Sequence, residues 1–403
     1  MMRLLVWARL PEGGIVAAGE LATSDADAHG RFSAEFEYSR DWLENRAGFD
    51  LDPVSLPRGA RGARFSAEGF VPPLGVFLDA LPDSWGRRIL RIKIAVGADR
   101  SDPALLATMG AGGLGALAFA APAKPPVAPR ASPTEVLRDL LDAAEALERG
   151  NLPDTHRFRR LLEGPTPGGA RPKALVHDAE SEWIAKFPSR DDGPHDIVGL
   201  EAACMSLAER ARIQVPKTRI VQVGVRRALL IERFDITPPG GRRHMVSFRL
   251  LCKESPGRQA IAYDELADAV RRYSARPTED LARLFRQMTF NAAIGNVDDH
   301  SRNFAMVRDV PGWRLSPAFD LLPDHLGRRE HALAFLHGYA CPSRADLLAV
   351  ARQWSVDSAA LAIDEVAAAA CGFREAAERL KVGGGEALER VASDIDRRLA
   401  LLG

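Results

Sequence analysis

A proline-rich stretch divides this 403-residue chain into two parts. Residues 122–133 contain five prolines in twelve positions, with Ala, Lys and Arg among them. Proline fixes the backbone φ angle and removes an N–H donor, so the stretch favours extended backbone and resists incorporation into a helix. We therefore predict a linker at 122–133, with folded regions before and after it.

The two flanking regions have different patterns. Residues 1–121 predict a small α/β subdomain, because apolar runs flank the turn Pro11–Gly14 as in a hairpin. Residues 134–240 predict a sheet-rich lobe with one inserted helix, and helical periodicity dominates 241–403 apart from a hairpin near 304–316. The sequence thus predicts an α+β protein, in which an N-terminal α/β subdomain precedes a bilobal region with a helical C-terminal lobe.

The composition excludes several classes of protein. Apolar residues make up 46% and charged residues 27% of the chain, which is typical of globular proteins and not of disordered ones. Lys plus Arg and Asp plus Glu number 54 each, so no whole-chain field attracts nucleic acid or anionic lipid. The four cysteines form no C-x-x-C pair, and no segment resembles a signal peptide or a membrane span. We expect a cytoplasmic protein without membrane association.

The segment Gly295–Phe304 contains the strongest candidates for chemistry. Asp298 and Asn303 have the D-x-x-x-x-N spacing with which kinase catalytic loops place a base at the acceptor hydroxyl and an amide oxygen on a metal ion. The next residues predict a β-hairpin that would bring Asn303 and Asp320 to one point, where two oxygen ligands suit Mg²⁺. The alternative is that Asp298, Asp299 and Asn303 only cap helices and form turns.

Two upstream features predict a phosphate site. The small-residue loop Gly168–Lys173 can present backbone N–H groups to phosphate oxygens, although it lacks the P-loop pattern. Lys186 stands alone in the apolar strand Trp183–Phe187, and a lysine in such a place needs an anion beside it. Glu201, on the next predicted helix, is a candidate ion-pair partner. The alternatives are an edge-strand lysine that faces solvent and a solvated helix carboxylate.

Two further patterns are not assigned to a ligand. Gly110–Gly115 fits G-x-G-x-x-G, but a helical pattern precedes it and a strand pattern follows it, the reverse of a dinucleotide site. The basic run Arg87, Arg88, Arg91 and Lys93 favours a solvated helix face, with contacts to DNA phosphates as the alternative.

Five motifs, taken in order, resemble those of the HipA-like serine/threonine kinases, which are toxins of type II toxin–antitoxin modules. The motifs are Gly168–Lys173, Trp183–Pro188, Glu232–Asp235, Gly295–Phe304 and Leu315–Asp320. Phe77–Gly86 and Gly115–Leu117 are similar to that family's N-terminal subdomain, so the resemblance spans nearly the whole chain. It implies a protein kinase-like, HipA-type fold that binds ATP and Mg²⁺ between two lobes.

The resemblance also implies roles for individual residues. Asp298 would be the catalytic base, Lys186 would act on the phosphates, and Asn303 and Asp320 would bind the metal. Residues 168–173 would cover the phosphates, and residues 232–234 would hold adenine. The full implied nucleotide site is Gly168, Gly169, Ala170, Arg171, Pro172, Lys173, Lys186, Glu232, Arg233, Phe234, His300, Ser301, Arg302, Asn303, Phe319 and Asp320.

The implied partners follow from the same resemblance. They are a separate helix-turn-helix antitoxin (HipB-like), operator DNA bound through the toxin–antitoxin complex, and a protein substrate with a Ser or Thr acceptor, such as an aminoacyl-tRNA synthetase. Two other functions stay open. One is a pseudokinase that serves as a co-repressor scaffold. A pseudokinase would be expected to lose the catalytic and nucleotide-binding residues, and this chain has them. The other is a small-molecule kinase of the aminoglycoside phosphotransferase type, which the N-terminal subdomain disfavours.

The sequence departs from the family pattern at two places. Thr166 stands where the family often has an autophosphorylated Ser; threonine accepts phosphate too, but its β-branch stiffens the loop. The doubled Asp298-Asp299 stands where some members have one Asp, and the spacing to Asn303 favours Asp298.

Overall fold

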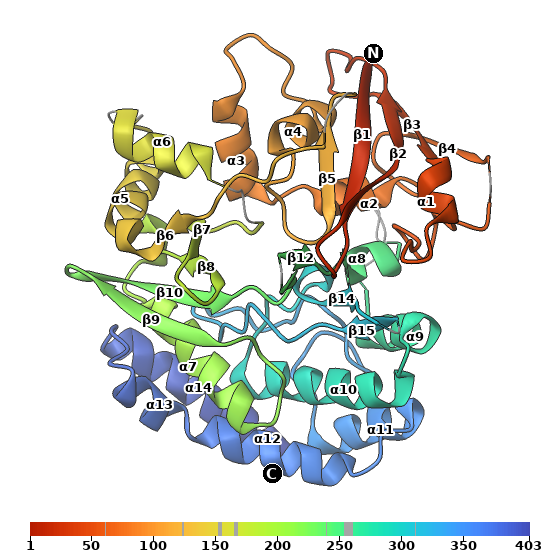
Figure 1. Cartoon of the computed structure of the whole chain (residues 1–403). Coiled ribbons are helices and arrows are strands. Elements are labelled where there is room, and N and C mark those ends of the chain that lie inside the picture. The colour runs from red at the N-terminus through yellow and green to blue at the C-terminus, as the bar shows by residue number, and fades with distance from the viewer. Residues whose placement is uncertain are drawn as a thin grey trace. The chain divides into compact units, whose positions relative to one another are not determined.

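The structure is a computed structural model that describes residues 1–60, 62–122, 125–151, 155–164, 168–238, 240–253, 261–310 and 312–403 (Figure 1). They form two compact units. The first, called the N-unit here, comprises Met1–Ser189 and Glu232–Val246; the second, the C-unit, comprises Arg190–Ile231 and Ser247–Gly403. The linker at 122–133 lies within the N-unit, and the four predicted domain ranges stay predictions.

The N-unit is a mixed α/β region. Its elements are β1 (Met2–Arg9), β2 (Ile15–Thr23), β3 (Ser33–Tyr38), α1 (Arg40–Glu44), β4 (Arg64–Glu68), α2 (Gly75–Ala80), α3 (Ser84–Lys93), α4 (Asp102–Met109), β5 (Leu117–Ala120), β6 (Ser132–Pro133), α5 (Leu137–Glu148), α6 (Thr155–Glu163), β7 (Lys173–His177), β8 (Glu182–Lys186), β11 (Ile236–Thr237) and β12 (Gly241–Arg242).

The N-terminal part of the N-unit contains an antiparallel five-stranded sheet in the order β4-β3-β2-β1-β5 (Figure 1). Alternate residues of β3 are buried, as a sheet with one covered face requires. Phe36, Phe77 and Phe119 form its aromatic core, with ring centroids 5.3 Å and 6.2 Å apart along the series. The predicted hairpin at Pro11–Gly14 is confirmed, because β1 and β2 pair antiparallel across it.

A second strand group follows the proline-rich stretch. β6 pairs parallel with β7, and β7 pairs antiparallel with β8. α5 buries Leu140, Leu141, Ala144 and Leu147, which form an apolar stripe along one side of the helix.

The C-unit is mostly helical. Its elements are α7 (Ile197–Arg210), β9 (Thr218–Val223), α8 (Phe248–Leu251), α9 (Tyr263–Tyr273), α10 (Pro277–Ile294), β14 (Ala305–Arg308), β15 (Trp313–Leu315), α11 (Arg344–Trp354), α12 (Ala359–Cys371), α13 (Phe373–Arg379) and α14 (Glu386–Leu402). The chain passes between the units at three places: after Ser189, within β10 (Arg226–Glu232) and within β13 (Met245–Ser247).

The C-unit is built around α10. This helix packs against α9, α12 and α14, and Phe285, Met288, Phe290 and Ile294 are fully buried. It begins at Pro277, where the missing N–H costs no helical hydrogen bond, and it ends at Gly295 in the left-handed conformation. The helical C-terminal region is thereby confirmed. None of the helices in the described ranges is long and apolar enough to cross a lipid bilayer.

Candidate functional site

The candidate phosphate loop of the N-unit is held by residues next to α3. Gly169 has a φ of +97°, and an added methyl group would overlap Nζ of Lys173, so this position requires glycine. The Gly169 N–H donates to Oδ2 of Asp83 at 2.9 Å, and its carbonyl accepts from the Trp85 N–H at 3.3 Å. The Trp85 indole donates to the Lys173 carbonyl at 2.9 Å. The loop is therefore fixed at both ends.

Two lysines lie on one face of the β7–β8 pair. Lys173 and Lys186 are directly opposite each other in the antiparallel register. Opposed residues of this kind project to the same face, with Cβ atoms roughly 5 Å apart. Lys173 is 6% exposed, and its ammonium group lies against Gly169. The two side chains therefore lie on one face beside the glycine loop, and their contact with phosphates stays a prediction.

The polar side chains after β10 are committed to one another within the N-unit. The Arg233 guanidinium is 1% exposed and contacts Oδ2 of Asp235 at 2.6 Å and Oε2 of Glu182 at 3.0 Å. The Gly115 N–H also donates to Asp235, at 2.8 Å. Burial by itself raises the pKa of Asp235, but the charge and hydrogen bonds of Arg233 lower it below its ordinary value. The Arg233 N–H also donates to the Glu182 carbonyl at 2.9 Å, so these groups form a closed network.

Burial distinguishes the two adjacent carboxylates of the C-unit, Asp298 and Asp299. Asp299 is 0% exposed: Oδ2 accepts from the Tyr263 hydroxyl at 2.6 Å, and Oδ1 accepts from the Ala332 N–H at 2.8 Å. Nδ1 of His331 lies 3.0 Å from Oδ2. Burial, followed by the Asp299 charge, raises the pKa of Tyr263 well above its ordinary value, so the hydroxyl stays a donor. Asp299 is therefore a structural residue.

A neutral histidine tautomer completes this network. Nη1 of Arg398 lies 3.2 Å from Nε2 of His331. Arginine only donates, so Nε2 must accept and the proton of the ring must be on Nδ1, where it is donated to Asp299. Arg398 also lies against Gly295, where an added methyl group would come 2.6 Å from its Nε atom.

Asp298 has the opposite environment. Its side chain is 58% exposed, and Oδ1 lies 3.2 Å from Nη1 of Arg328. Nδ2 of Asn303, at the end of the 3₁₀ turn Ser301–Asn303, donates to the Asp298 carbonyl at 2.8 Å. The predicted base and the predicted metal ligand are thus joined directly, and the carboxylate is accessible.

Asp320 approaches the same segment from the other side of the hairpin. The predicted hairpin is confirmed by the pairing of β14 with β15, in which Met306 is opposite Leu315. Asp320 has a φ of +53°, and its carbonyl accepts from Nδ2 of Asn296 at 3.3 Å. Asn296 precedes Asp298 by two residues, so the two segments meet within the C-unit. The convergence of Asn303 and Asp320 on one point stays a prediction.

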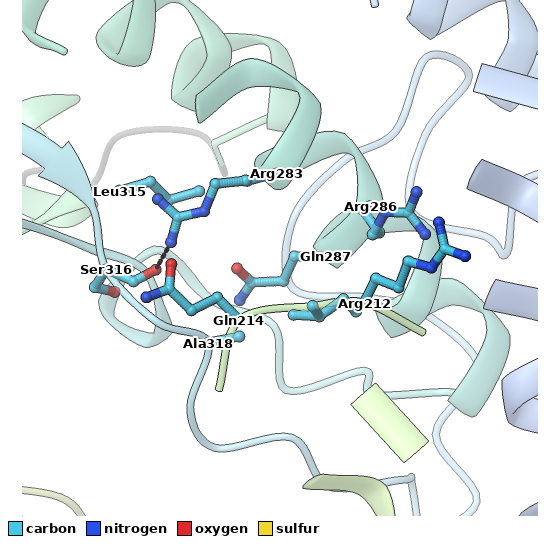
Figure 2. A pocket seen from close by; sticks show the side chains of 9 residues that line it. Arg212, Gln214, Arg283, Arg286, Gln287, Leu315, Ser316 and Ala318 are labelled. Atoms are coloured by element: carbon cyan, nitrogen blue, oxygen red, sulfur yellow. Dashed lines mark hydrogen bonds between the residues drawn. The ribbon is translucent and has the colours of Figure 1, made fainter. Parts of the chain in front are cut away.

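The residues before Asp320 line a small pocket of about 20 Å³, and hydrogen bonds with its other lining residues hold them in place (Figure 2). Nη2 of Arg283 donates to the Ser316 carbonyl at 3.1 Å, which is the dashed line in Figure 2. The Ala318 N–H donates to the Gln214 carbonyl at 2.8 Å. Each arginine of the pocket is ion-paired: Arg283 pairs with Asp280, while Arg212 and Arg286 share Glu365. This cluster therefore supports the Asp320 segment.

The predicted metal ligands have suitable donor chemistry. Asn303 and Asp320 offer one amide and one carboxylate oxygen, and Mg²⁺ takes few protein ligands of this type together with waters and phosphates. Because Nδ2 of Asn303 is committed to Asp298, its Oδ1 atom is the one left for a cation. Across the residues that the structure describes, no group of three or more His, Cys, Asp or Glu side chains is placed to hold a metal by itself.

The predicted site residues divide between the two units. Residues 168–173, Lys186 and 232–234 belong to the N-unit, and residues 298–303, Phe319 and Asp320 belong to the C-unit. The predicted Lys186–Glu201 pair joins residues of different units and stays a prediction. Thr166 lies outside the described residues.

Sequence reasoning missed the residues that hold the site. Asp83 anchors Gly169 from 86 positions away, and Tyr263 and His331 lie 36 and 32 positions from Asp299. No spacing rule connects such pairs. The one available signal was the doubled aspartate, since two adjacent carboxylates rarely share one environment.

The two unassigned patterns have structural roles. Gly110–Gly115 lies between α4 and β5, which confirms the predicted order of helix and strand. Three members of the basic run act within the N-unit: Arg87 pairs with Asp102, and Arg88 and Lys93 donate to backbone carbonyls.

Comparisons with known proteins agree with this architecture. Residues 15–120 match the HipA N-terminal domain, and residues 166–376 match the HipA-like C-terminal domain. Y4mE of Sinorhizobium fredii, named as a candidate kinase, is 25% identical over 323 residues, which cover 73% of each chain. Y4dM of the same organism, also named as a candidate kinase, is 31% identical over 159 residues, 35% of this chain and 37% of that protein.

A solved structure shows the same fold. HipA of Shewanella oneidensis MR-1, in a complex with HipB and its operator DNA, matches with a TM-score of 0.69 and 18% identity. The match covers 98% of this chain and 96% of that chain. This likeness confirms the predicted HipA-type fold.

Proposed function

Because this chain belongs to the HipA family, with that family's N-terminal and C-terminal domains in order, we propose that it is a kinase that phosphorylates Ser or Thr residues of a protein. We also propose that it is the toxin of a HipBA-type toxin–antitoxin system. Its similarity to Y4mE, a candidate kinase by name, supports the first proposal. The HipA–HipB–DNA complex of Shewanella supports the second, with a HipB-like antitoxin and operator DNA as partners.

The contrast between two adjacent carboxylates carries the kinase proposal. A general base must reach the acceptor hydroxyl from the surface and must not be committed to buried donors. Asp298 meets both conditions, because it is exposed and its contact with Arg328 is an exposed ion pair. Asp299 meets neither. Asn303, at kinase spacing, is hydrogen-bonded to Asp298 itself.

The N-unit would bind the nucleotide through charge and backbone groups. Lys186 and Lys173 would offset the charge of the phosphates beside Gly169. The Gly169 N–H already donates to Asp83, so a phosphate would displace that carboxylate or use neighbouring amides. The Phe234 carbonyl already accepts from Arg243 at 2.8 Å, so adenine would meet the amide of that residue.

The chemistry needs little covalent participation from the chain. Bound ATP supplies the phosphoryl group, and Asn303 and Asp320 would hold the Mg²⁺ that offsets its charge. Asp298 would orient the acceptor hydroxyl and take its proton at the exposed carboxylate. Positioning and electrostatics of this kind dominate phosphoryl transfer, so loss of the base should lower the rate on the order of 10²- to 10⁴-fold.

The test is transfer from radiolabelled ATP to the proteins of a cell extract. Asp298→Asn should lower the rate at which protein bands are labelled on the order of 10²- to 10⁴-fold. It should keep the wild-type melting temperature, since exposed positions tolerate substitution. Asp357→Asn, which neutralises an exposed carboxylate on the turn before α12, is the matched control and should keep full transfer. Thr166→Ala would test separately whether the chain phosphorylates itself.

The competing functions give different results in the same assay. Label in a metabolite instead of a protein would support a small-molecule kinase. No transfer by the wild type, together with binding to the antitoxin, would support a scaffold. Full activity of Asp298→Asn would refute the assignment of the base.

A further inference from the structure

A large polar cavity lies within the C-unit, next to the proposed base. Its volume is about 910 Å³, and its walls are the loop 324–329, α14 and His195. This volume is at the upper end of the range for ligand pockets, roughly 300–1,000 Å³. None of the functions proposed above uses this cavity.

Three contacts connect the cavity to the catalytic segment. Arg328 lines the cavity, and its Nη1 atom lies 3.2 Å from Oδ1 of Asp298. The Asp324 N–H donates to the Gly295 carbonyl at 2.8 Å, which fastens the loop 324–329 to the start of that segment. At the inner wall, Arg398 lies against Gly295. A chain that placed a hydroxyl at Asp298 would therefore run along the cavity.

The cavity has positive charge that the chain itself does not use. Five arginines and four carboxylates line it. Arg397 and Arg398 share Asp394, and Arg328 contacts Asp324 as well as Asp298. Over the described ranges, no hydrogen bond or ion pair engages the side chains of Arg329 and Arg390, both exposed. Glu386 is the one lining carboxylate in the same state, so the uncommitted side chains carry a net positive charge.

The opening of the cavity is also apolar in part. Leu326 and Leu401, at 65% and 48% exposure, are large apolar residues exposed on the C-unit, and both line the cavity. Two exposed leucines next to two uncommitted arginines favour a ligand that has both apolar and acidic groups, as an extended peptide does.

We propose that this cavity binds the part of the protein substrate that flanks the acceptor hydroxyl, and that it selects segments rich in Asp and Glu. The inference rests on the proposed kinase function and specifies its substrate class. Arg329 and Arg390 would pair with acidic side chains of the substrate, and Leu326 and Leu401 would cover apolar ones. An extended chain advances about 3.3 Å per residue, so the flanking acidic residues would lie within a few positions of the acceptor.

The test uses two fluorescein-labelled peptides with the same central Ser and either Glu or Lys at the flanking positions. Binding to the full chain is measured by fluorescence anisotropy with a non-hydrolysable ATP analogue present, and phosphorylation is measured with ATP. Wild-type protein should bind the Glu peptide about tenfold more tightly and phosphorylate it with a lower KM. The double variant Arg329→Glu/Arg390→Glu should lose or invert this preference while kcat changes little.

A matched variant separates a local effect from an overall charge effect. Arg272→Glu/Arg352→Glu changes the net charge by the same amount at two exposed arginines outside the cavity and should keep the wild-type preference. An unchanged preference in the cavity variant, or an equal loss in the matched variant, would overturn the proposal. So would displacement of the Glu peptide by inorganic phosphate alone, because the cavity would then be a simple anion site.

Failure of the proposed function would look different. If wild-type protein bound the Glu peptide through Arg329 and Arg390 but phosphorylated no peptide or protein, the kinase assignment would fail and the peptide site would stand. If it phosphorylated both peptides with equal KM, the kinase would stand and the site would fail.

Discussion

Two short polar runs, residues 232–235 in the N-unit and residues 298–303 in the C-unit, look equivalent in the sequence and are used in opposite ways. In the first run, Arg233 and Asp235 are buried and neutralise each other, so neither of these two side chains is left for a ligand. In the second, Asp299 is buried while the neighbouring Asp298 lies at the surface. The comparison teaches that a polar motif contributes to chemistry only through the side chains that the fold leaves uncommitted.

The largest expected effect is on the buried ion pair. Asp235→Ala should lower the free energy of unfolding by about 3–5 kcal/mol, because it removes the more buried of the two carboxylates that pair with the Arg233 guanidinium and leaves the partly exposed Glu182. Urea denaturation measures this loss. The double variant Arg233→Met/Asp235→Leu removes both charges and should recover most of it. If the double variant is as unstable as the single one, the two residues do not act as a pair.

The next largest effect is the pH dependence of stability that the buried carboxylate of Asp52 causes. Asp52 is 0% exposed, and burial raises its pKa to about 6, in contrast to the lowered pKa of Asp235. From the ordinary carboxyl pKa of 3.8 up to about pH 6, the folded state therefore keeps a proton that the unfolded state has lost, so stability falls as pH rises. The total loss by neutral pH is at most about 3 kcal/mol.

The measurement is the difference in unfolding free energy between Asp52→Asn and wild type at several pH values. That difference should shift in favour of the variant by up to about 3 kcal/mol between about pH 4 and pH 7, whatever the substitution costs by itself. A difference that does not change with pH would contradict the raised pKa.

A smaller effect distinguishes the two adjacent aspartates. Asp299→Asn should lower the unfolding free energy by about 2 kcal/mol, because the Tyr263 hydroxyl and the His331 ring lose a charged acceptor. Asp298→Asn should change it by less than about 0.5 kcal/mol. Equal losses in thermal or urea unfolding would contradict the division of roles between the two residues.

The next smaller loss of stability lies in the phosphate loop. Gly169→Ala forces a side chain into a positive φ and against Lys173, at a cost of about 1–2 kcal/mol. ATP affinity, measured by calorimetry, should fall as well, because the loop must shift. Gly59→Ala is the control, since a methyl group there meets open space. Unchanged ATP affinity in Gly169→Ala would remove the loop from the nucleotide site.

The sequence predicted the elements of this fold better than the contacts between them. The predicted strand Trp183–Phe187 corresponds to β8 within one residue at each end, and β14 and β15 form the hairpin predicted near 304–316. Periodicity and turn chemistry are local, so they can be read from the sequence. The anchors Asp83, Tyr263 and Arg328 depend on which distant segments pack together, and no local pattern encodes that.

The register of β7 against β8 limits how this family member can change over evolution. Lys173 and Lys186 share a face only because they are opposite each other in the pairing. Inserting one residue into β8 before Lys186 would turn that lysine to the other face, whereas inserting two would return it. Related chains that keep both lysines should therefore differ in the length of this strand by even numbers only.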